Sequence, residues 1–199
     1  MERTVYDQDL VAASVLQFLQ GVGEDPSREG LVGTPDRVSR AWRELLGGYG
    51  QDPKEILRTS DGKDGFAEIG GYDEMIVVSG IEFYSTCEHH LLPFTGKIDL
   101  GYIPGDSGKV VGLSKLPRLV EVFARRLQVQ ERLTRQIAEA MNESLSPMGV
   151  GVRVSSEHAC MTCRGVRKQS RMVTEALLGN FREHPVRAEF WELANRGAR

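Results

Sequence analysis

Residues 75–92 read MIVVSGIEFYSTCEHHLL, and at this point the chain changes from a helical to an extended pattern. The apolar residues in the first part of this stretch recur with a period near two, which is typical of strands. Alternation returns at residues 97–102 and 150–154, and residues 110–113 are also expected to be extended. Together with the helices described next, these segments predict an α+β fold.

Helical patterns precede and follow these strands. Asp7 can cap a first helix, and Thr34 followed by Pro35 is a typical helix start with the threonine as N-cap. The sequence predicts helices over residues 8–21, 34–46, 53–57, 114–127, 130–145 and, interrupted at Pro185, 174–195. Residues 160–173 are expected to be extended, and the polar, glycine-rich residues 59–73 to form a mobile loop or a domain boundary.

The composition is that of an ordinary globular domain. The 199 residues carry 25 Lys+Arg against 28 Asp+Glu, a net charge of −3, which offers no electrostatic footprint for nucleic acid. No apolar run reaches the ~18 residues of a membrane span, and residues 1–10 lack the apolar core of a signal peptide. We therefore expect a cytoplasmic protein with reduced thiols, and its three cysteines, an odd number, argue against a disulfide framework.

Cysteine and histidine are concentrated in two short windows. The first holds Cys87 and His90, just after a predicted strand, and the second holds His158, Cys160 and Cys163, again after a strand. Thiolate and imidazole are the ligands that zinc prefers. Two arrangements stay open: a closed structural site of Cys87, His90, Cys160 and Cys163, or a catalytic site whose three protein ligands leave one position for water.

The neighbours of these windows bear on that choice. Ligand spacing alone slightly favours the structural site. Glu88, His89 and His158, however, lie at its edge, and a proton donor and acceptor near a metal-bound water are what hydrolytic chemistry needs. The alternative interpretation of the two histidines is ordinary polar surface.

A second group of candidate residues surrounds two helix starts. Ser114 precedes a predicted helix whose first turn carries Lys115 and Arg118, and a helix N-terminus with two cations can bind phosphate. The alternative is a capped amphipathic helix with solvated basic residues. Gln130 and Glu131 open the next helix, where the carboxylate can serve the helix dipole or accept from the N–H groups of a guanine.

The remaining arginines of this part of the chain divide into two kinds. Arg164, four residues after Cys160, is a third cation close to the predicted metal site. The others are expected to be solvated or interface charges; they are Arg125, Arg126, Arg132 and Arg135.

Three motifs make the sequence resemble a known family. They are YSTCEHHLLPFTGKIDLGYIP, VVGLSKLPRLVEVFARRLQVQERLTRQIAEA and HACMTCRGVRK, and they closely resemble GTP cyclohydrolase I, with similarity over about residues 30–190. The resemblance implies a tunnelling fold: an antiparallel four-stranded sheet backed by two helices. It implies a helical extension and glycine-rich connector over residues 1–73, and a catalytic domain over residues 74–199. It also implies a homodecamer of two pentameric rings, with sites between subunits.

The resemblance further implies a reaction and the residues that perform it. GTP would be hydrolysed in the imidazole ring of its guanine to formate and 7,8-dihydroneopterin triphosphate, the first step of pterin and folate biosynthesis. Cys87, His90 and Cys160 match the zinc ligands, a set that ferrous iron also tolerates, and His89 and His158 match histidines that shuttle protons. The matches to substrate-binding residues are Gln130 and Glu131 for guanine, and Ser114, Lys115, Arg118, Arg164 and Arg37 for the ribose and triphosphate.

One residue near the metal ligands departs from the family pattern. Cys163 stands where the family commonly has Met or another apolar residue, and strand geometry would point it away from Cys160. Other functions stay open on the sequence: another tunnelling-fold enzyme acting on a purine or pterin, or a non-catalytic, zinc-stabilised assembly protein with a Cys₃His site. A regulatory relative that binds nucleotide without turnover is a third.

Overall fold

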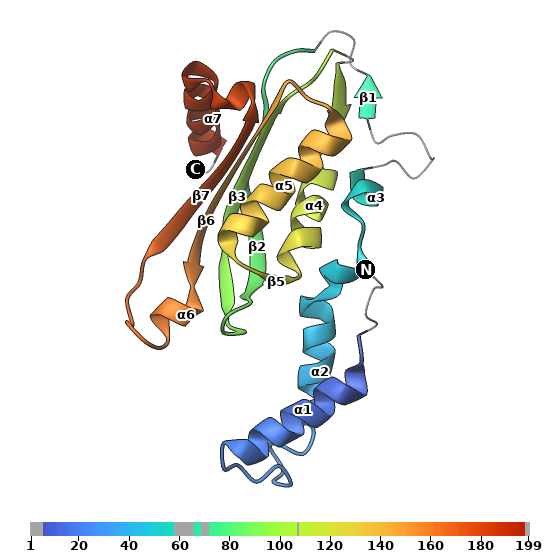
Figure 1. Ribbon diagram of the computed structural model, residues 1–199, viewed down its shortest axis with the longest axis vertical. Helices are drawn as coiled ribbons and strands as arrows, with labels where there is room; N and C mark the ends of the chain where they lie inside the picture. Colours follow the sequence, from blue (N-terminus) through green and yellow to red (C-terminus); the bar gives the residue numbers. More distant parts are fainter. Residues whose placement is uncertain (1–5, 58–65, 69–71, 107, 198–199) are drawn as a thin grey trace.

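The computed structural model describes residues 6–57, 66–68, 72–106 and 108–197 (Figure 1). Its helices are α1 (Gln8–Gly21), α2 (Thr34–Leu45), α3 (Pro53–Leu57), α4 (Lys115–Ala124), α5 (Gln130–Leu145), α6 (Ala159–Thr162) and α7 (His184–Gly197). Its strands are β1 (Phe66–Glu68), β2 (Ile76–Cys87), β3 (Pro93–Ile103), β4 (Lys109–Val111), β5 (Leu127–Gln128), β6 (Gly149–His158) and β7 (Arg171–Gly179). Short 3-10 turns, η1 (Gly47–Gly50) and η2 (Asn180–Arg182), link neighbouring elements.

The central sheet has the strand order β5-β2-β3-β6-β7. Its long strands β2, β3, β6 and β7 run antiparallel to their neighbours, and α4 and α5 lie across one face (Figure 1). The expected α+β, tunnelling-type arrangement, a four-stranded antiparallel sheet backed by two helices, is therefore confirmed. The two-residue β5 is an addition that the sequence analysis did not predict: it runs parallel to the end of β2, with Cys87 opposite Gln128.

The main core lies between this sheet and the two helices. The apolar stripe predicted on α5 is confirmed, since Leu133, Ile137 and Met141 are fully buried and Leu145 is nearly so. Burying one such side chain contributes about 1.5–3 kcal/mol to stability. This packing holds α5 firmly against β6 and β7, so the first turn of α5 is fixed at the edge where β6 ends.

The opposite face of the sheet carries α7. Phe181, Phe190 and Ala194 form a second buried cluster there. Glycines in the strands make room for the rings: a Cβ on Gly151 would lie 2.4 Å from Cδ1 of Phe181, and one on Gly101 would lie 2.8 Å from Cδ2 of Phe190. A side chain at either glycine would therefore push α7 away from the sheet.

The C-terminal third differs from its predicted elements. Residues 171–173 are extended as predicted, but β7 continues through residues 174–179, which were expected to begin a helix, and the long helix begins only at His184, directly before Pro185. Proline is tolerated in the first turn of a helix, where its missing N–H is not needed, so Pro185 helps to begin the helix instead of interrupting it. The stretch expected to be extended contains α6, which places Cys160 in a helical turn.

Smaller differences concern helix ends. The helix predicted over residues 114–127 ends at Ala124, and the chain then forms β5. Ser114 stands at the N-cap position but has helical backbone angles and makes no side-chain cap bond. Gly33, not Thr34, is the N-cap of α2, whereas Asp7 caps α1 through its side chain as predicted.

The predicted loop over residues 59–73 lies largely outside the described residues. Within it, β1 pairs with β4 in a separate two-stranded ribbon. The helices α1 and α2 pack on each other as a hairpin that extends beyond one end of the sheet (Figure 1). In the described part of the chain, every helix is too short or too polar to cross a membrane.

Candidate active site

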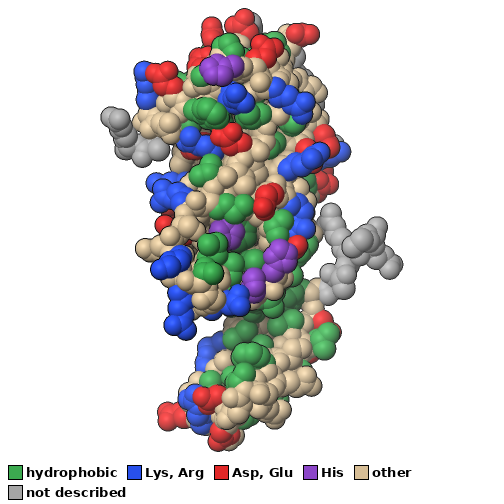
Figure 2. Space-filling model, turned by 60° about the vertical axis from the view of Figure 1, so that its left-hand side comes forward, with side chains coloured by type: hydrophobic (Ala, Val, Ile, Leu, Met, Phe, Trp, Pro, Cys, Tyr) green, Lys and Arg blue, Asp and Glu red, His purple; other side chains and the backbone are tan. Residues whose placement is uncertain are grey.

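The sheet topology brings the two Cys/His windows to one edge. β3 runs antiparallel to both β2 and β6, so β2 and β6 end on the same side of the sheet. Phe94 of β3 lies opposite both Ser85 of β2 and His158 of β6. The turn after Cys87 and the helical turn that holds Cys160 therefore meet, although they are far apart in the sequence. Figure 2 shows histidine side chains close together on this part of the surface, near the α1–α2 hairpin.

Cys87, His90 and Cys160 form a group of potential metal ligands. Their donor atoms all lie within 4.8 Å of one another, and Cys87 Sγ is 3.8 Å from His90 Nδ1. Around a tetrahedral zinc ion, with Zn–S of about 2.3 Å and Zn–N of about 2.0–2.1 Å, the S···N distance would be about 3.6 Å. Burial, and next the neighbouring Cys87 thiol, raise the pKa of Cys160, and a bound cation would reverse this effect. Donor type and spacing therefore fit zinc.

Two backbone hydrogen bonds close the turn that carries the first two donors. The Cys87 N–H donates to the Leu92 carbonyl at 2.8 Å, and the Leu91 N–H donates back to the Cys87 carbonyl at 2.9 Å. Leu91 completes the turn with φ of 55°, in the left-handed region. Cys87 is buried at the strand end and His90 is exposed on the turn, so an ion held there would lie at the surface.

Cys163 does not belong to this group. It is the exposed C-cap residue of α6, whereas Cys160, in the first turn of the same helix, faces Cys87 and His90. The expected separation of the two thiols is found, but the expected reason is wrong, because these residues form a helical turn and not a strand. In the described part of the chain the group thus has three protein donors, the number typical of catalytic rather than structural zinc sites.

His158 lies beside the ligand group in a defined environment. Its ring stacks on Phe94, with centroids 4.7 Å apart and an interplanar angle of 1°. Its Nε2 is 2.9 Å from Oε1 of Gln130 and 3.2 Å from Oγ of Ser156. Burial lowers the pKa of His158, and the carboxylate of Glu131 opposes this in part by raising it. The ring is therefore neutral near pH 7, and stacking and hydrogen bonds set its orientation.

Gln130 is buried, and its amide is engaged within the chain. Its Nε2 donates to the carbonyl oxygens of Val154 and Met172 and to Oγ1 of Thr174, each at 3.1 Å. These acceptors identify the NH₂ end of the amide, so Oε1 must face His158. His158 then carries its proton on Nε2 and has its lone pair on Nδ1. Gln130, which the resemblance assigns to guanine, is thus placed beneath His158.

Other predicted residues form a polar rim around the group. The His89 side chain is 65% exposed, and its Nε2 lies 3.9 Å from Oε1 of Glu88. Glu131 is exposed in the first turn of α5. Arg164 brings its Nη1 to 3.2 Å from Nε2 of His90. One end of the sheet thereby combines metal donors, two histidines, carboxylates and a cation.

The predicted phosphate-binding residues at the start of α4 lie at the opposite end of the sheet. They are Ser114, Lys115 and Arg118. Leu116 in the same turn packs near Val78, early in β2, whereas the metal donors follow the end of that strand. A strand rises about 3.3 Å per residue, so the path from Val78 to Cys87 is about 30 Å. Within one chain, therefore, these residues are too far from the metal donors to lie in the same site. Arg37 lies on α2 and donates to two groups of its own hairpin.

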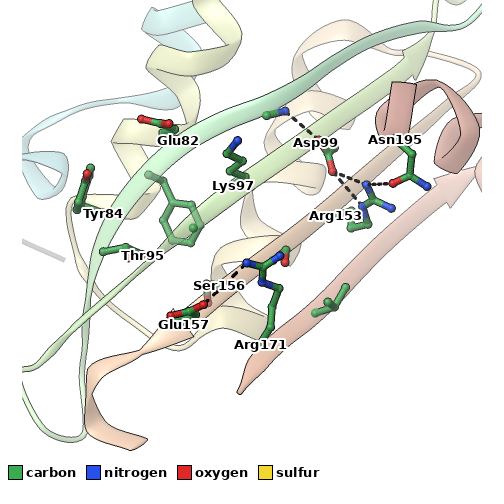
Figure 3. A pocket seen from close by; sticks show the side chains of 15 residues that line it. Glu82, Tyr84, Thr95, Lys97, Asp99, Arg153, Ser156, Glu157, Arg171 and Asn195 are labelled. Carbon is green, nitrogen blue, oxygen red and sulfur yellow. Dashed lines mark hydrogen bonds and ion pairs between the residues drawn. The ribbon is translucent and has the colours of Figure 1, made fainter. Parts of the chain in front are cut away.

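A cavity of about 680 Å³ lies elsewhere, beside α7 on the face of the sheet that carries this helix (Figure 3). Its charged residues are matched across neighbouring strands. Nη2 of Arg153 lies 2.8 Å from Oδ2 of Asp99, and Nη2 of Arg171 lies 3.8 Å from Oε1 of Glu157. None of the predicted site residues lines this cavity. The candidate chemistry therefore belongs to the strand ends and not to the sheet face.

Sequence analysis missed three contributors to the site: Phe94, Ser156 and Arg132. Phe94 and Ser156 act through strand register and a buried network, for which one sequence offers no direct signal. Arg132 was expected to be a solvated or interface charge; its side chain is 42% exposed and also pairs with Glu88. Its position two residues after Gln130, on the same helical turn, is the one local hint of that role.

The chain is similar to proteins of one family over most of its length. The family model for GTP cyclohydrolase I matches residues 11–195. A GTP cyclohydrolase 1 of Dehalococcoides mccartyi is 48% identical over 191 residues, 95% of this chain and 97% of its own. That of Thermobifida fusca is 50% identical over 189 residues, 94% and 88% of the two chains, and that of Chlorobaculum tepidum is 52% identical over 182 residues, 90% and 78%. Among solved structures, the archaeosine synthase QueF-Like in its apo form has a TM-score of 0.36 and 17% identity, covering 54% of this chain and 95% of its own.

Proposed function

The chain belongs to the GTP cyclohydrolase I family, and from this membership we propose how its residues perform the reaction. It is an enzyme with GTP cyclohydrolase I activity, which hydrolyses the imidazole ring of GTP to formate and 7,8-dihydroneopterin triphosphate. The observation that carries the proposal is the convergence of Cys87, His90 and Cys160 with His158 beside them.

We propose that Cys87, His90 and Cys160 hold a zinc ion, with ferrous iron as the alternative that this ligand set accepts. Two thiolates and an imidazole, with donor atoms within 4.8 Å of one another, suit the chemistry and size of zinc. When bound, zinc lowers the pKa of a coordinated water towards about 7 and so supplies a nucleophile at neutral pH. The protein's role is to hold the ion at a surface turn, close to the proton-transfer residue His158.

His158 is the residue that we assign to proton transfer with the guanine ring. The carbon between the two imidazole nitrogens is only weakly electrophilic, and protonating the adjacent nitrogen makes it easier to attack. His158 is neutral, has Nε2 held by Gln130 and carries its lone pair on Nδ1. Nδ1 would therefore first accept the proton that the attacking water releases and then pass it to the nitrogen of the guanine ring. General acid–base help of this kind is worth about 10²–10⁴ in rate. His89, exposed beside Glu88, is the second proposed proton-transfer group.

Glu131 is the proposed recognition group for guanine. Its carboxylate is exposed in the first turn of α5 and lies near enough to His158 to raise the pKa of that ring. A carboxylate can accept from the amino and the ring N–H groups of guanine together. Gln130 contributes indirectly, because its amide is occupied in holding His158.

The phosphate-binding residues call for a second copy of the chain. Lys115 and Arg118 lie at the end of the sheet opposite to the metal donors, about 30 Å away along β2. Each proposed site therefore pairs the metal end of one subunit, including Arg164, with the start of α4 of another. In the described sheet β7 lies at one edge and β5 covers only the end of β2, so both edges offer backbone groups for pairing between copies. The homodecamer of two pentameric rings is the assembly proposed, with Arg37 as a further triphosphate contact.

Two coarser features complete the proposal. Residues 74–199 are assigned as the catalytic domain and residues 1–73 as the helical extension with its connector, because all the proposed metal and proton-transfer residues fall in the second segment. A cytoplasmic location is proposed because Cys87 and Cys160 must stay reduced to bind a metal.

Incubation of purified, metal-assayed protein with GTP tests this function. Formate and, after oxidation, a fluorescent pterin should appear together, should stop when a chelator removes the metal, and should return when zinc is restored. Refilling with ferrous iron instead compares the two candidate metals directly. A protein that binds zinc but releases no formate would be a zinc-stabilised assembly protein or an enzyme for another purine or pterin, and the proposal would be wrong.

A further inference from the structure

Arg132, in the first turn of α5, is bound on every nitrogen of its guanidinium. Nη1 lies 3.4 Å from Oε1 of Glu88, and Nη2 makes a closer contact with Oε2 of the same carboxylate. Nε donates to Oε1 of Gln128 at 3.0 Å, and Nη2 also donates to the Leu127 carbonyl at 3.1 Å. A fork of two parallel bonds to one carboxylate fixes both groups in direction as well as distance.

Gln128, which accepts the bond from Nε of Arg132, is itself held by hydrogen bonds. Gln128 is buried, and its Nε2 donates to the Phe123 carbonyl at 3.0 Å and to Oε1 of Gln136 at 2.8 Å, so its own Oε1 is turned towards Arg132. The Gln128 carbonyl accepts from the Glu88 N–H at 3.0 Å. Arg132 is therefore held on the packed corner between β5 and α5, and from there it reaches the turn that carries the metal donors.

Glu88 is the link between that corner and the ligands. It directly follows Cys87 and comes two residues before His90, so its backbone lies inside the segment whose shape sets the distance between the two donors. The His90 N–H makes only a long bond of 3.4 Å to the Cys87 carbonyl, and His90 itself is exposed. A side-chain clamp on Glu88 adds the restraint that this exposed half of the turn lacks.

We propose that Arg132 is a positioning residue for the metal centre: by clamping Glu88 to the β5–α5 corner, it keeps Cys87 and His90 in the arrangement that binds the ion. The inference rests on the metal assignment made above but not on the reaction. It assigns Glu88 to holding the turn in place rather than to proton transfer with substrate. Partners that orient metal ligands typically contribute 10–100-fold to metal affinity or activity.

Zinc affinity of the full chain, measured by competition with a chromophoric chelator in the absence of GTP, tests the proposal. Arg132→Ala and Glu88→Ala should each weaken zinc binding about tenfold. The double variant should be no weaker than either single one, because both remove the same contact. Arg135→Ala is the matched control: this arginine lies one turn further along α5 and pairs with the half-exposed Glu139, and its loss should leave zinc affinity unchanged.

Arg132→Lys is the second variant, for use if the alanine variant does not fold. A lysine keeps the charge but donates to the carboxylate from a single point, so zinc binding should still weaken several-fold. Equal affinity of wild type and Arg132→Lys or Arg132→Ala would overturn the proposal, as would losses that multiply in the double variant. A wild-type protein that takes up no zinc at all would contradict the metal assignment as well, whereas wild-type binding with unchanged variants contradicts the clamp alone.

Discussion

At the end of the sheet where β2 and β6 finish, one chain brings together three metal donors, a neutral histidine and the carboxylate of Glu131. At the end where α4 begins, the same chain presents Ser114, Lys115 and Arg118, with the metal donors about 30 Å away along a strand. Both groups were expected in one site. In the proposed shared site, one chain supplies the metal donors and the proton-transfer residues, and the start of α4 of a neighbouring subunit supplies the cations.

The physics of the two tasks explains this division. Metal coordination and proton transfer require placement to within about 0.5 Å, which adjacent strand ends and a packed helix provide. Attraction between charges acts over longer distances, with a screening length of about 8 Å at physiological salt, and it tolerates looser geometry. In a site shared between subunits, one chain can therefore supply the metal and proton-transfer residues while its neighbour supplies the cations.

The largest expected effect comes from breaking the metal end. Cys160→Ser removes one of the three donors, so zinc should be lost and formate release should fall roughly a thousandfold or more, the scale seen when one member of a concerted catalytic group is removed. GTP binding should persist, because the cations at the other end are untouched. Zinc content, formate and equilibrium GTP binding measure the three quantities. Normal turnover by this variant would show that the chemistry does not reside at this end.

The next effect sharpens the roles within the metal end. His158→Ala should keep zinc, because His158 is not one of the three donors, and should lower formate release by about 10²–10⁴. His184→Ala, at the exposed start of α7, is the control and should behave like wild type. Loss of zinc together with activity would mean that His158 serves the metal and not the proton.

A mixing experiment tests the comparison between the two ends directly. The variant Cys160→Ser and the double variant Lys115→Ala/Arg118→Ala should each be inactive, since each lacks one half of every site. When the two are unfolded and reassembled together in equal amounts, about a quarter of the shared sites should pair two intact halves, and formate release should recover to about that fraction. If hetero-oligomers form but formate release does not recover, both halves of the site must lie in one subunit.

The smallest expected effect concerns Cys163. Because this thiol is exposed and lies outside the donor group, Cys163→Ser should leave zinc content unchanged and alter turnover by no more than about twofold, the range of ordinary surface substitutions. Zinc content and formate release are measured side by side with wild type. Loss of both metal and fold in this variant would support the closed Cys₃His site instead. Such a site leaves no coordination position for water and so contradicts the catalytic interpretation.

Several features of this protein could be predicted from local sequence. The spacing of Leu133, Ile137 and Met141 predicted α5 from its first residue to its last, because the buried face of a helix repeats within the sequence itself. The two Cys/His windows predicted a metal group, because few other residue types bind zinc. Residues 174–179 of β7 were mistaken for a helix, since Leu177 and Leu178 are both partly buried on opposite faces of a strand and obscure its alternation.

The sequence by itself determined which chemistry this chain can perform: its cysteines, histidines and acidic residues, and the helices and strands that carry most of them. Only the tertiary structure decided which of these side chains meet. It placed Cys160 and not Cys163 with Cys87, turned the amide of Gln130 towards His158, drew Arg132 onto Glu88 and separated Lys115 from the metal donors. Each of these outcomes depends on strand register and on packing between distant segments, and neither leaves a periodic trace along the chain.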